Sequence, residues 1–244
     1  MLPIRDHNPS QATPFVTLAL IGVNIAVYLW GLVALQTDQQ LGQFYFDYAF
    51  FPVLLSEGQN ASALVTSIFL HGGFFHLAGN MLFLWIFGDN MEEEMGHLPF
   101  LAFYLACGIG ASLAQYTGDP LSQIPMVGAS GAIAGVMGGY LLLFPKARVD
   151  IFVFFIIFFR ILPIPAWILL GLWFGIQVLG GLAADTSAGG VAYWAHAGGF
   201  VLGLALTIPL WLRRGAGAYW RRTDGHPPHP ETVYRRSAVP LVRR

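Results

Sequence analysis

Residues 127–140 read Val127-Gly128-Ala129-Ser130-Gly131-Ala132-Ile133-Ala134-Gly135-Val136-Met137-Gly138-Gly139-Tyr140, an apolar stretch that opens with one serine between glycines. In a helix its small side chains fall on two neighbouring rows, with Ser130, Ala134 and Gly138 on one and Gly131, Gly135 and Gly139 on the other. Such a smooth face lets two transmembrane backbones come unusually close. The stretch therefore predicts a closely packed helix inside a membrane.

Ser130 would lie at the start of this helix, where backbone N–H groups lack partners and the helix dipole is positive. A serine in that place can act as a nucleophile with an anion site beside it. Plain helix packing is the alternative. Taken alone, Gly-x-Ser-Gly favours packing, because the chain has 29 glycines.

The composition is that of a membrane protein. Of the 244 residues, 56% are hydrophobic and 10% are charged, whereas a soluble domain carries about 25% charged residues. The mean hydropathy is +0.61. The single cysteine, Cys107, excludes an internal disulfide and lies in an apolar run, so we expect it to be a buried small hydrophobe.

Six apolar runs indicate an all-α membrane protein with six transmembrane helices. The predicted spans cover about 15–35, 63–88, 98–116, 129–145, 166–182 and 191–212. A short acidic turn, 89–97, follows the second span. The loop over about 36–60 is amphipathic and rich in aromatic residues, which favours a position in the membrane interface.

Three further segments lie outside the predicted spans. Residues 1–13 form a polar N-terminal segment. Residues 149–162 are very apolar but too short for the ~20 residues that a span needs, so we expect an interfacial or re-entrant segment. The tail, 213–244, is rich in Arg and Pro, which predicts disorder and contact with anionic headgroups. Tyr219 and Trp220 would mark the interface.

The distribution of charge predicts the orientation. With both termini inside, the inner segments hold every Lys and Arg, while the outer loops hold Asp38, Asp47, Glu57, Asp119 and Asp185. This is what the positive-inside rule requires. We expect both termini in the cytoplasm and the chain in a bacterial or archaeal cell membrane.

Polar side chains inside spans are costly and are therefore candidate functional residues. In the sixth span, His196, Gly199 and Gly203 share one helical face. If that face meets the face below Ser130, the serine hydroxyl and the histidine ring come within hydrogen-bond distance. The histidine could then take the serine proton and return it to a leaving amine. These spans offer no acid to orient His196, so the minimal arrangement is a dyad.

His76 and Asn80 lie four residues apart on one face of the second span. Both can donate hydrogen bonds to a developing oxyanion, together with the backbone N–H of Ser130. The alternative is an interhelical hydrogen bond that only holds helices together. His71 lies about 140° from His76 around a regular helix, so we expect it at the edge between loop and helix, as a support or a donor.

The motifs together resemble the rhomboid family of intramembrane serine proteases. They are His71-Gly-Gly-Phe-Phe-His76-Leu-Ala-Gly-Asn80, Gly128-Ala129-Ser130-Gly131 and Ala195-His196-Ala-Gly-Gly199-Phe-Val-Leu-Gly203, in the family's order. The resemblance covers about 14–212. Glu92 and Gly96 are similar to the family's Glu-xxx-Gly, with Glu94 where a basic residue is common. Ala134 replaces a tyrosine that some members place against the histidine.

The resemblance implies a six-helix bundle with a membrane-lying first loop and a Ser130–His196 dyad. It further implies an oxyanion hole of His76, Asn80, Gly128 and Ser130, with support from His71, Gly131, Gly199 and Gly203. The implied partners are single-pass transmembrane substrates, cleaved near their outer end, and membrane lipid. No cofactor, metal or nucleic acid is expected. Substrates would enter between the second and fifth spans, past a gate that includes Phe174, Gln177 and Val178.

Three rival functions remain. A metal-dependent protease needs spacing such as His-Glu-x-x-His, which no predicted span contains. A catalytically inactive rhomboid-like adaptor would bind transmembrane helices, but such proteins typically lack the serine or the histidine. A transporter or channel needs a polar path through both leaflets, whereas the polar residues here gather in the outer half. The oligomeric state and the substrate stay open.

Overall fold

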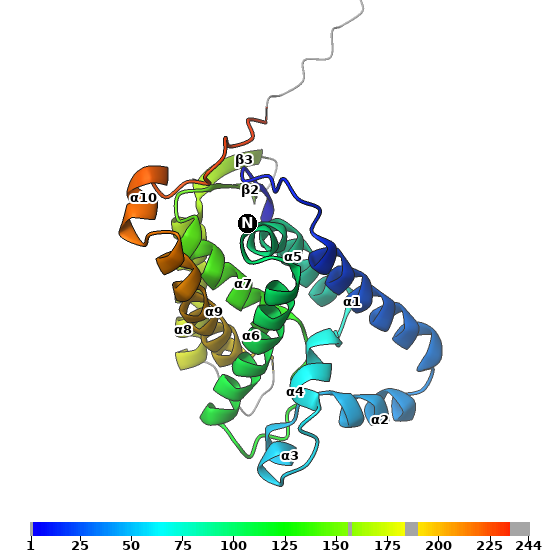
Figure 1. Ribbon diagram of the computed structural model, residues 1–244. Helices are drawn as coiled ribbons and strands as arrows, with labels where there is room; N and C mark the ends of the chain where they lie inside the picture. The colour runs from blue at the N-terminus through cyan, green and yellow to red at the C-terminus, as the bar shows by residue number, and fades with distance from the viewer. Residues whose placement is uncertain (1, 156–157, 184–189, 235–244) are drawn as a thin grey trace, which may run out of the picture.

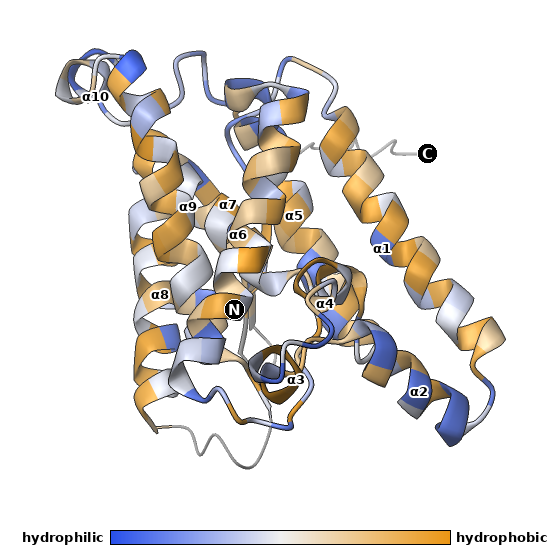
Figure 2. Ribbon diagram, turned by 60° about the horizontal axis from the view of Figure 1, so that its bottom comes forward, coloured by the Kyte–Doolittle hydropathy of each residue, from blue (hydrophilic) through white to orange (hydrophobic). Residues whose placement is uncertain are grey.

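The computed structural model describes residues 2–155, 158–183 and 190–234, which form a bundle of helices with a small sheet at one end (Figure 1). Within these residues, four helices are long and apolar enough to cross a membrane: α1 (Phe15–Ala34), α6 (His97–Gly118), α8 (Ala166–Ala183) and α9 (Tyr193–Arg213). Apolar residues dominate them (Figure 2). The chain is a multi-pass helical membrane protein, as predicted.

The second predicted span is broken. The chain bends by 95° between the short helices α4 (Ala63–Thr66) and η1 (Ser67–Phe69) and the long helix α5 (Phe74–Met95), and this bent pair is a fifth candidate span. The break contains Gly72 and Gly73. Glycine is unfavourable inside a helix and tolerates extended or turn backbone, so these two residues favour a break at this point. The predicted second span over 63–88 therefore corresponds to this bent pair, and its path across the membrane stays a prediction.

α5 also includes the acidic residues expected in a turn over 89–97, which corrects that prediction. The buried carboxylate of Glu92 accepts hydrogen bonds from the backbone N–H groups of Val16 (2.8 Å) and Thr17 (2.7 Å), and from the Thr17 hydroxyl (2.7 Å). These amides begin α1, which has no side-chain cap of its own. Glu92 supplies the cap from another helix, and this role explains an acid on the buried side of α5.

α7 (Ser130–Leu143) lies at the centre of the bundle and is almost entirely buried. Its glycine rows meet α9 backbone to backbone. A Cβ on Gly199 would collide with the carbonyl oxygen of Gly131, and a Cβ on Gly203 would collide with that of Gly135. The predicted close approach of these two helices is confirmed.

The count of six spans and the membrane-lying loop stay predictions. α7 has 14 residues, which at ~1.5 Å each extend roughly 21 Å, against about 30 Å for a hydrocarbon core. The loop over 36–60 contains two helices, α2 (Asp38–Tyr48) and α3 (Pro52–Ser56). α2 begins with a capping box between Thr37 and Gln40.

Three antiparallel strands cover one end of the bundle: β1 (Leu2–Asp6), β2 (Arg148–Phe155) and β3 (Phe158–Pro165), in the order β1-β2-β3. The described residues of the apolar run over 149–162 therefore belong to an antiparallel β-hairpin of β2 and β3. The expected interfacial or re-entrant position of this run in the membrane stays a prediction. Its β-branched and aromatic residues favour strands, and β1 gives the hairpin a third strand. The sequence does not predict β1, because so short a polar segment shows no periodic pattern.

The predicted disorder of the tail is wrong over the part that the structure describes. α10 (Gly217–Thr223) packs back against the bundle, where the rings of Trp220 and Trp211 lie 4.8 Å apart. Tyr219 is buried by protein, which corrects its expected place at the membrane interface. The packing of these aromatic rings against the bundle gives a defined structure to a segment whose composition predicts disorder.

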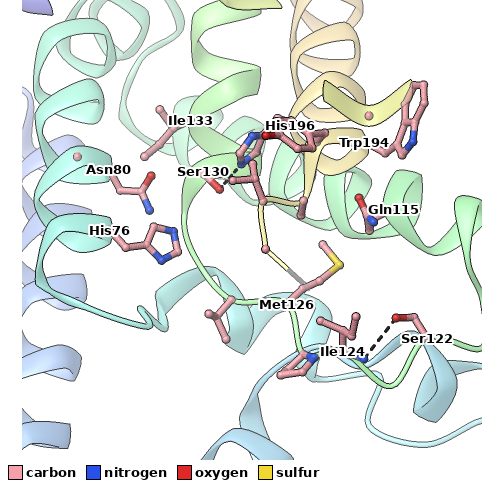
Figure 3. A pocket seen from close by; sticks show the side chains of 18 of the residues that line it. His76, Asn80, Gln115, Ser122, Ile124, Met126, Ser130, Ile133, Trp194 and His196 are labelled. Carbon is pink, nitrogen blue, oxygen red and sulfur yellow. Dashed lines mark hydrogen bonds between the residues drawn. The ribbon is translucent and has the colours of Figure 1, made fainter. Parts of the chain in front are cut away.

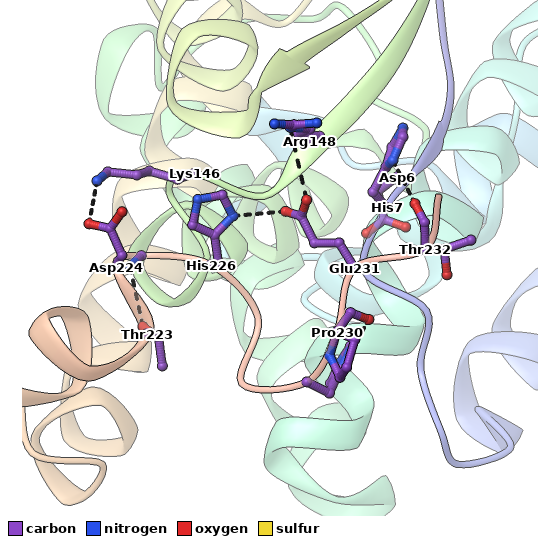
Figure 4. A network of polar contacts seen from close by, with 12 residues as sticks. Asp6, His7, Lys146, Arg148, Thr223, Asp224, His226, Pro230, Glu231 and Thr232 are labelled. Carbon is purple, nitrogen blue, oxygen red and sulfur yellow. Dashed lines mark hydrogen bonds and ion pairs between the residues drawn. The ribbon is translucent and has the colours of Figure 1, made fainter. Parts of the chain in front are cut away.

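The chain beyond α10 passes beside β1 (Figure 4). His226 Nδ1 lies 2.8 Å from the Glu231 carboxylate, and the Thr232 N–H donates to the carbonyl oxygen of His7 at 3.0 Å. The Tyr234 hydroxyl donates to the carbonyl oxygen of Asp6 at 3.2 Å. The predictions that fall on Asp185 and on residues 235–244 lie outside the described residues.

Both described ends of the chain thus meet at the end of the bundle that carries the sheet. The described Lys and Arg residues belong to this end as well, in or beside β1, β2, β3, α10 and the last turn of α9. The opposite end carries α2 and α3 (Figure 1). This separation agrees with the positive-inside rule, and the cytoplasmic location of both termini stays a prediction.

Candidate active site

A serine and a histidine meet where α7 and α9 begin. Ser130 is the first residue of α7, and His196 lies in the first turn of α9. The His196 Nε2 and the Ser130 Oγ are 2.7 Å apart (Figure 3). The glycine contacts between the two helices hold their ends together, so the expected hydrogen bond is present.

The second ring nitrogen of His196 has a partner that the sequence analysis missed. The Gln177 Oε1 of α8 lies 2.8 Å from the His196 Nδ1. Gln177 was expected in a gate, but its amide faces the histidine. It is the one side chain in α8 with an amide, in a helix that is otherwise apolar or aromatic. Because polar residues in spans are candidate functional residues, that rule could have found it.

A tryptophan takes the place of the absent tyrosine ring. The rings of Trp173 and His196 lie 5.9 Å apart at an interplanar angle of 33°. Trp173 comes from α8, one turn before Gln177. Because α7 has Ala134 where some family members have tyrosine, the aromatic neighbour of His196 comes from another helix, α8.

His76 and Asn80 line the same cavity as Ser130 and His196 (Figure 3). The Asn80 Nδ2 lies 2.9 Å from the His71 Nε2, and the rings of His71 and His76 lie 5.1 Å apart. His71 precedes α5, which begins at Phe74. The angle expected for one regular helix therefore does not apply, and the bend brings all three side chains together.

Gly128 lies close to His76, and its N–H already has a partner within the protein. Its expected place in the oxyanion hole stays a prediction. Its N–H donates to the carbonyl oxygen of Ser67 at 2.9 Å. Its φ is +120°, and a Cβ there would lie 2.7 Å from the His76 ring. Glycine is thus required for both backbone angle and space. The Ser130 N–H, at the first position of α7, has no partner within the helix.

The cavity has a volume of about 790 Å³ and lies between α5, α7, α8 and α9. Phe83, Met137 and Trp173 give it apolar walls. Its polar lining residues include Ser130, His196, His76, Asn80, Gln115, Asp119 and Ser122. The Ala195 N–H of α9 donates to the Gln115 Oε1 of α6 at 3.2 Å, which ties the start of α9 in place. Across residues 2–155, 158–183 and 190–234, no three His, Cys, Asp or Glu side chains lie close enough to hold a metal ion.

The apolar bundle with a serine–histidine pair beside its cavity places the chain in the class of multi-pass helical membrane proteins with a polar site among their helices. The family model described as "Rhomboid domain" matches residues 58–213. The chain belongs to the rhomboid family, which confirms the resemblance drawn from its motifs.

Three relatives show the extent of the similarity. "Rhomboid protein 1, mitochondrial" of Saccharomyces cerevisiae is 32% identical over 198 residues, which cover 76% of this chain and 50% of the relative. Two proteins of Bacillus subtilis, "Putative rhomboid protease YdcA" and "Rhomboid protease GluP", are 41% and 46% identical over 78 residues. Those residues cover 32% of this chain and 39% and 15% of the relatives. The chain thus spans half or less of each relative's length.

These relatives come from a mitochondrion and from a bacterium. They do not favour one kind of membrane for this chain. Its placement in a bacterial or archaeal cell membrane therefore stays a prediction.

Proposed function

We propose that the chain is an intramembrane serine endopeptidase that cleaves single-pass transmembrane proteins. The hydrogen bond of 2.7 Å between the Ser130 Oγ and the His196 Nε2, inside a cavity of an apolar bundle, carries the proposal. The names of the two B. subtilis relatives, which describe them as rhomboid proteases, support it.

The chemistry is acyl transfer in two steps. His196 Nε2 takes the hydroxyl proton as the Ser130 Oγ attacks the peptide carbonyl carbon. The tetrahedral intermediate collapses, the C–N bond breaks, and His196 returns the proton to the leaving amine. Water then enters and loses a proton to His196 as it attacks the acyl-enzyme. Departure of the new carboxyl product restores the Ser130 hydroxyl.

The oxyanion of the intermediate needs donors that are already in place. His76, Asn80 and the Ser130 N–H are the candidate donors, because the two side chains line the cavity beside the serine. His71 would hold Asn80 through their contact of 2.9 Å. Gly131, Gly199 and Gly203 would act indirectly, by keeping α7 and α9 in contact.

Substrate would enter between α5 and α8, which both line the cavity. A transmembrane helix shields its own peptide bonds, so helix-breaking residues near the cleaved bond would favour attack. Of the predicted gate residues, Phe174 stacks on Phe200 of α9 with ring centroids 4.9 Å apart. We expect Phe174→Ala to speed cleavage in vesicles. Equal rates for the variant and the wild type, in both vesicles and detergent, would refute the gate.

The arrangement across the membrane follows from the two ends of the bundle. We propose six spans with both termini on the cytoplasmic side, because both described ends and the described basic residues lie at the end with the sheet. The cavity would then open toward the outer side. Cysteine labelling from outside, at Ser62→Cys and at Ser10→Cys, tests this: only the first should react.

The decisive experiment is cleavage of a model single-span substrate by the purified protein in lipid vesicles. Ser130→Ala and His196→Ala should each abolish cleavage, while the control variants Ser62→Ala and His226→Ala should cleave normally. Thermal unfolding checks that each variant is folded. Cleavage by Ser130→Ala would remove the proposal. Absence of cleavage by the wild type, with several substrates tried, would favour the adaptor.

A further inference from the structure

We propose that Gln177 is a positioning residue that fixes the orientation and the tautomer of His196. The proposal rests on the proposed serine endopeptidase function for its kinetic consequences. Its structural content stands on the contact of 2.8 Å between the Gln177 Oε1 and the His196 Nδ1. The Gln177 side chain is buried, with 7% of the residue exposed.

The two ends of the Gln177 amide are distinguishable by their partners. The Gln177 Nε2 donates to the backbone carbonyl oxygen of Trp173 at 3.4 Å. A carbonyl oxygen can only accept, so the amide nitrogen must face it, and the Oε1 must face the histidine. The amide is therefore oriented by its own helix.

The orientation of the amide decides where the histidine carries its proton. The Gln177 Oε1 can only accept, so the His196 Nδ1 must donate. In a neutral ring this leaves the Nε2 as the acceptor, and the Nε2 is the atom that lies 2.7 Å from the Ser130 Oγ. Gln177 thus selects the tautomer in which His196 can act as the base.

Gln177 would also act when the ring becomes charged. As His196 takes the serine proton, both of its nitrogens carry hydrogen, and the Gln177 carbonyl dipole faces the Nδ1–H. In a Ser-His-Asp triad, a carboxylate does this with a full charge. An amide in an apolar bundle supplies orientation and a dipole while avoiding the cost of a buried carboxylate when the ring is neutral.

The test compares two substitutions of Gln177 with one control substitution elsewhere on α8, in lipid vesicles. Gln177→Leu removes the acceptor and keeps the approximate size, and Gln177→Glu restores an acceptor oxygen. Leu179→Ala, an exposed position on the same helix, is the matched control. We expect Gln177→Leu to lower kcat roughly 10- to 100-fold with KM within about twofold of wild type, the loss typical of a hydrogen bond to a charged group. Gln177→Glu should recover a kcat above that of Gln177→Leu, and the control should match wild type.

A readout without substrate separates this proposal from the proposed function. The readout is the NMR spectrum of protein labelled with ¹⁵N at its histidines. The signals that the wild type shows and His196→Ala lacks belong to His196. Wild type should carry the proton on the Nδ1, and Gln177→Leu should shift it toward the Nε2. An unchanged tautomer in folded Gln177→Leu, or a normal kcat, would overturn the role of Gln177. If the wild type cleaves nothing, the function fails, but the tautomer result still decides this proposal.

Discussion

The α7–α9 interface and the α8 side of the bundle are built in opposite ways. Along α7 and α9, glycines bring backbone against backbone, and an added Cβ at Gly203 would collide with Gly135. Along α8, Gly171 and Gly175 have no neighbouring atom within 4 Å of an added Cβ. Near its end, α8 also meets α9 closely, since a Cβ at Gly180 or Gly181 would collide with the ring of Tyr193 or Trp194. The contrast therefore concerns the first part of α8, which has open space beside its glycines, whereas the α7–α9 interface has none.

The difference assigns the two sides different tasks. The nucleophile and the base come from the tight pair, since reacting atoms need a fixed geometry. The amide of Gln177 comes from α8, beside the route proposed for substrate. If α8 moves to admit a substrate, it carries the partner of the His196 Nδ1 with it. Entry of substrate to the cavity and the orientation of His196 would then both depend on the position of α8.

The largest expected effect breaks the tight interface. Gly203→Leu places a side chain against the Gly135 backbone, which cannot move aside. Ordinary overpacking lowers the free energy of unfolding by roughly 1–3 kcal/mol, and we expect this variant to lose the upper end of that range or more. Gly171→Leu on α8 meets open space and should leave stability unchanged. Thermal unfolding in the same micelles measures both. Equal destabilisation by the two variants would contradict the comparison.

A smaller effect separates chemistry from access. Asn80→Ala removes a proposed oxyanion donor, and such losses lower kcat about 10²- to 10³-fold. Leu172→Ala, at an exposed position of α8, should change neither kcat nor KM. Cleavage kinetics in vesicles measure both constants. A rise in KM alone for Asn80→Ala would assign this side chain to binding.

The smallest effect concerns the other end of α7, where the Tyr140 hydroxyl donates to the Asp6 carboxylate at 2.8 Å. Burial raises the pKa of Asp6 from 3.8 to about 8; the hydrogen bond from Tyr140 opposes this shift, and the charge of Asp89 adds to it. Because Asp6 holds its proton more tightly in the folded protein, its protonation stabilises the fold. This stabilisation is fully present below the pKa of the unfolded chain, 3.8, and is lost as the pH rises to the folded pKa of about 8.

The melting temperature of wild type should therefore fall by several degrees between pH 5 and pH 8.5. Asp6→Asn should show a flatter dependence, because the amide does not titrate. Leu2→Gln, a change at an exposed position of β1, is the control. An equally steep fall in Asp6→Asn would show that Asp6 is not the group that titrates.

Much of the site could be predicted because it depends on local spacing. The small residues after Ser130 and after His196 repeat every three or four positions, and this repeat determines which helices touch. Gln177 was visible as a polar residue in a span, but its partner depends on the rotation of α8 about its axis. No periodicity within one helix reports that rotation.

Other features depend on contacts between distant parts of the chain. Glu92 looks like a turn residue until the start of α1 is placed beside it. The bend at His71 is suggested by two glycines, yet its consequence, the contact with Asn80, requires the three-dimensional path. β1 exists because β2 offers it an edge, and five residues carry too little pattern to reveal this.

The contacts around β1 also set an order of events during synthesis. His7 Nδ1 lies 2.8 Å from the carbonyl oxygen of Thr232, 225 positions later in the chain. At the ~5–20 residues per second of ribosomal synthesis, His7 waits roughly 10–45 s for this partner. The intervening helices have been made by then. The hydrogen bonds between His7, directly after β1, and Thr232 can therefore form only when every intervening helix has been synthesised, so they complete the fold and do not start it.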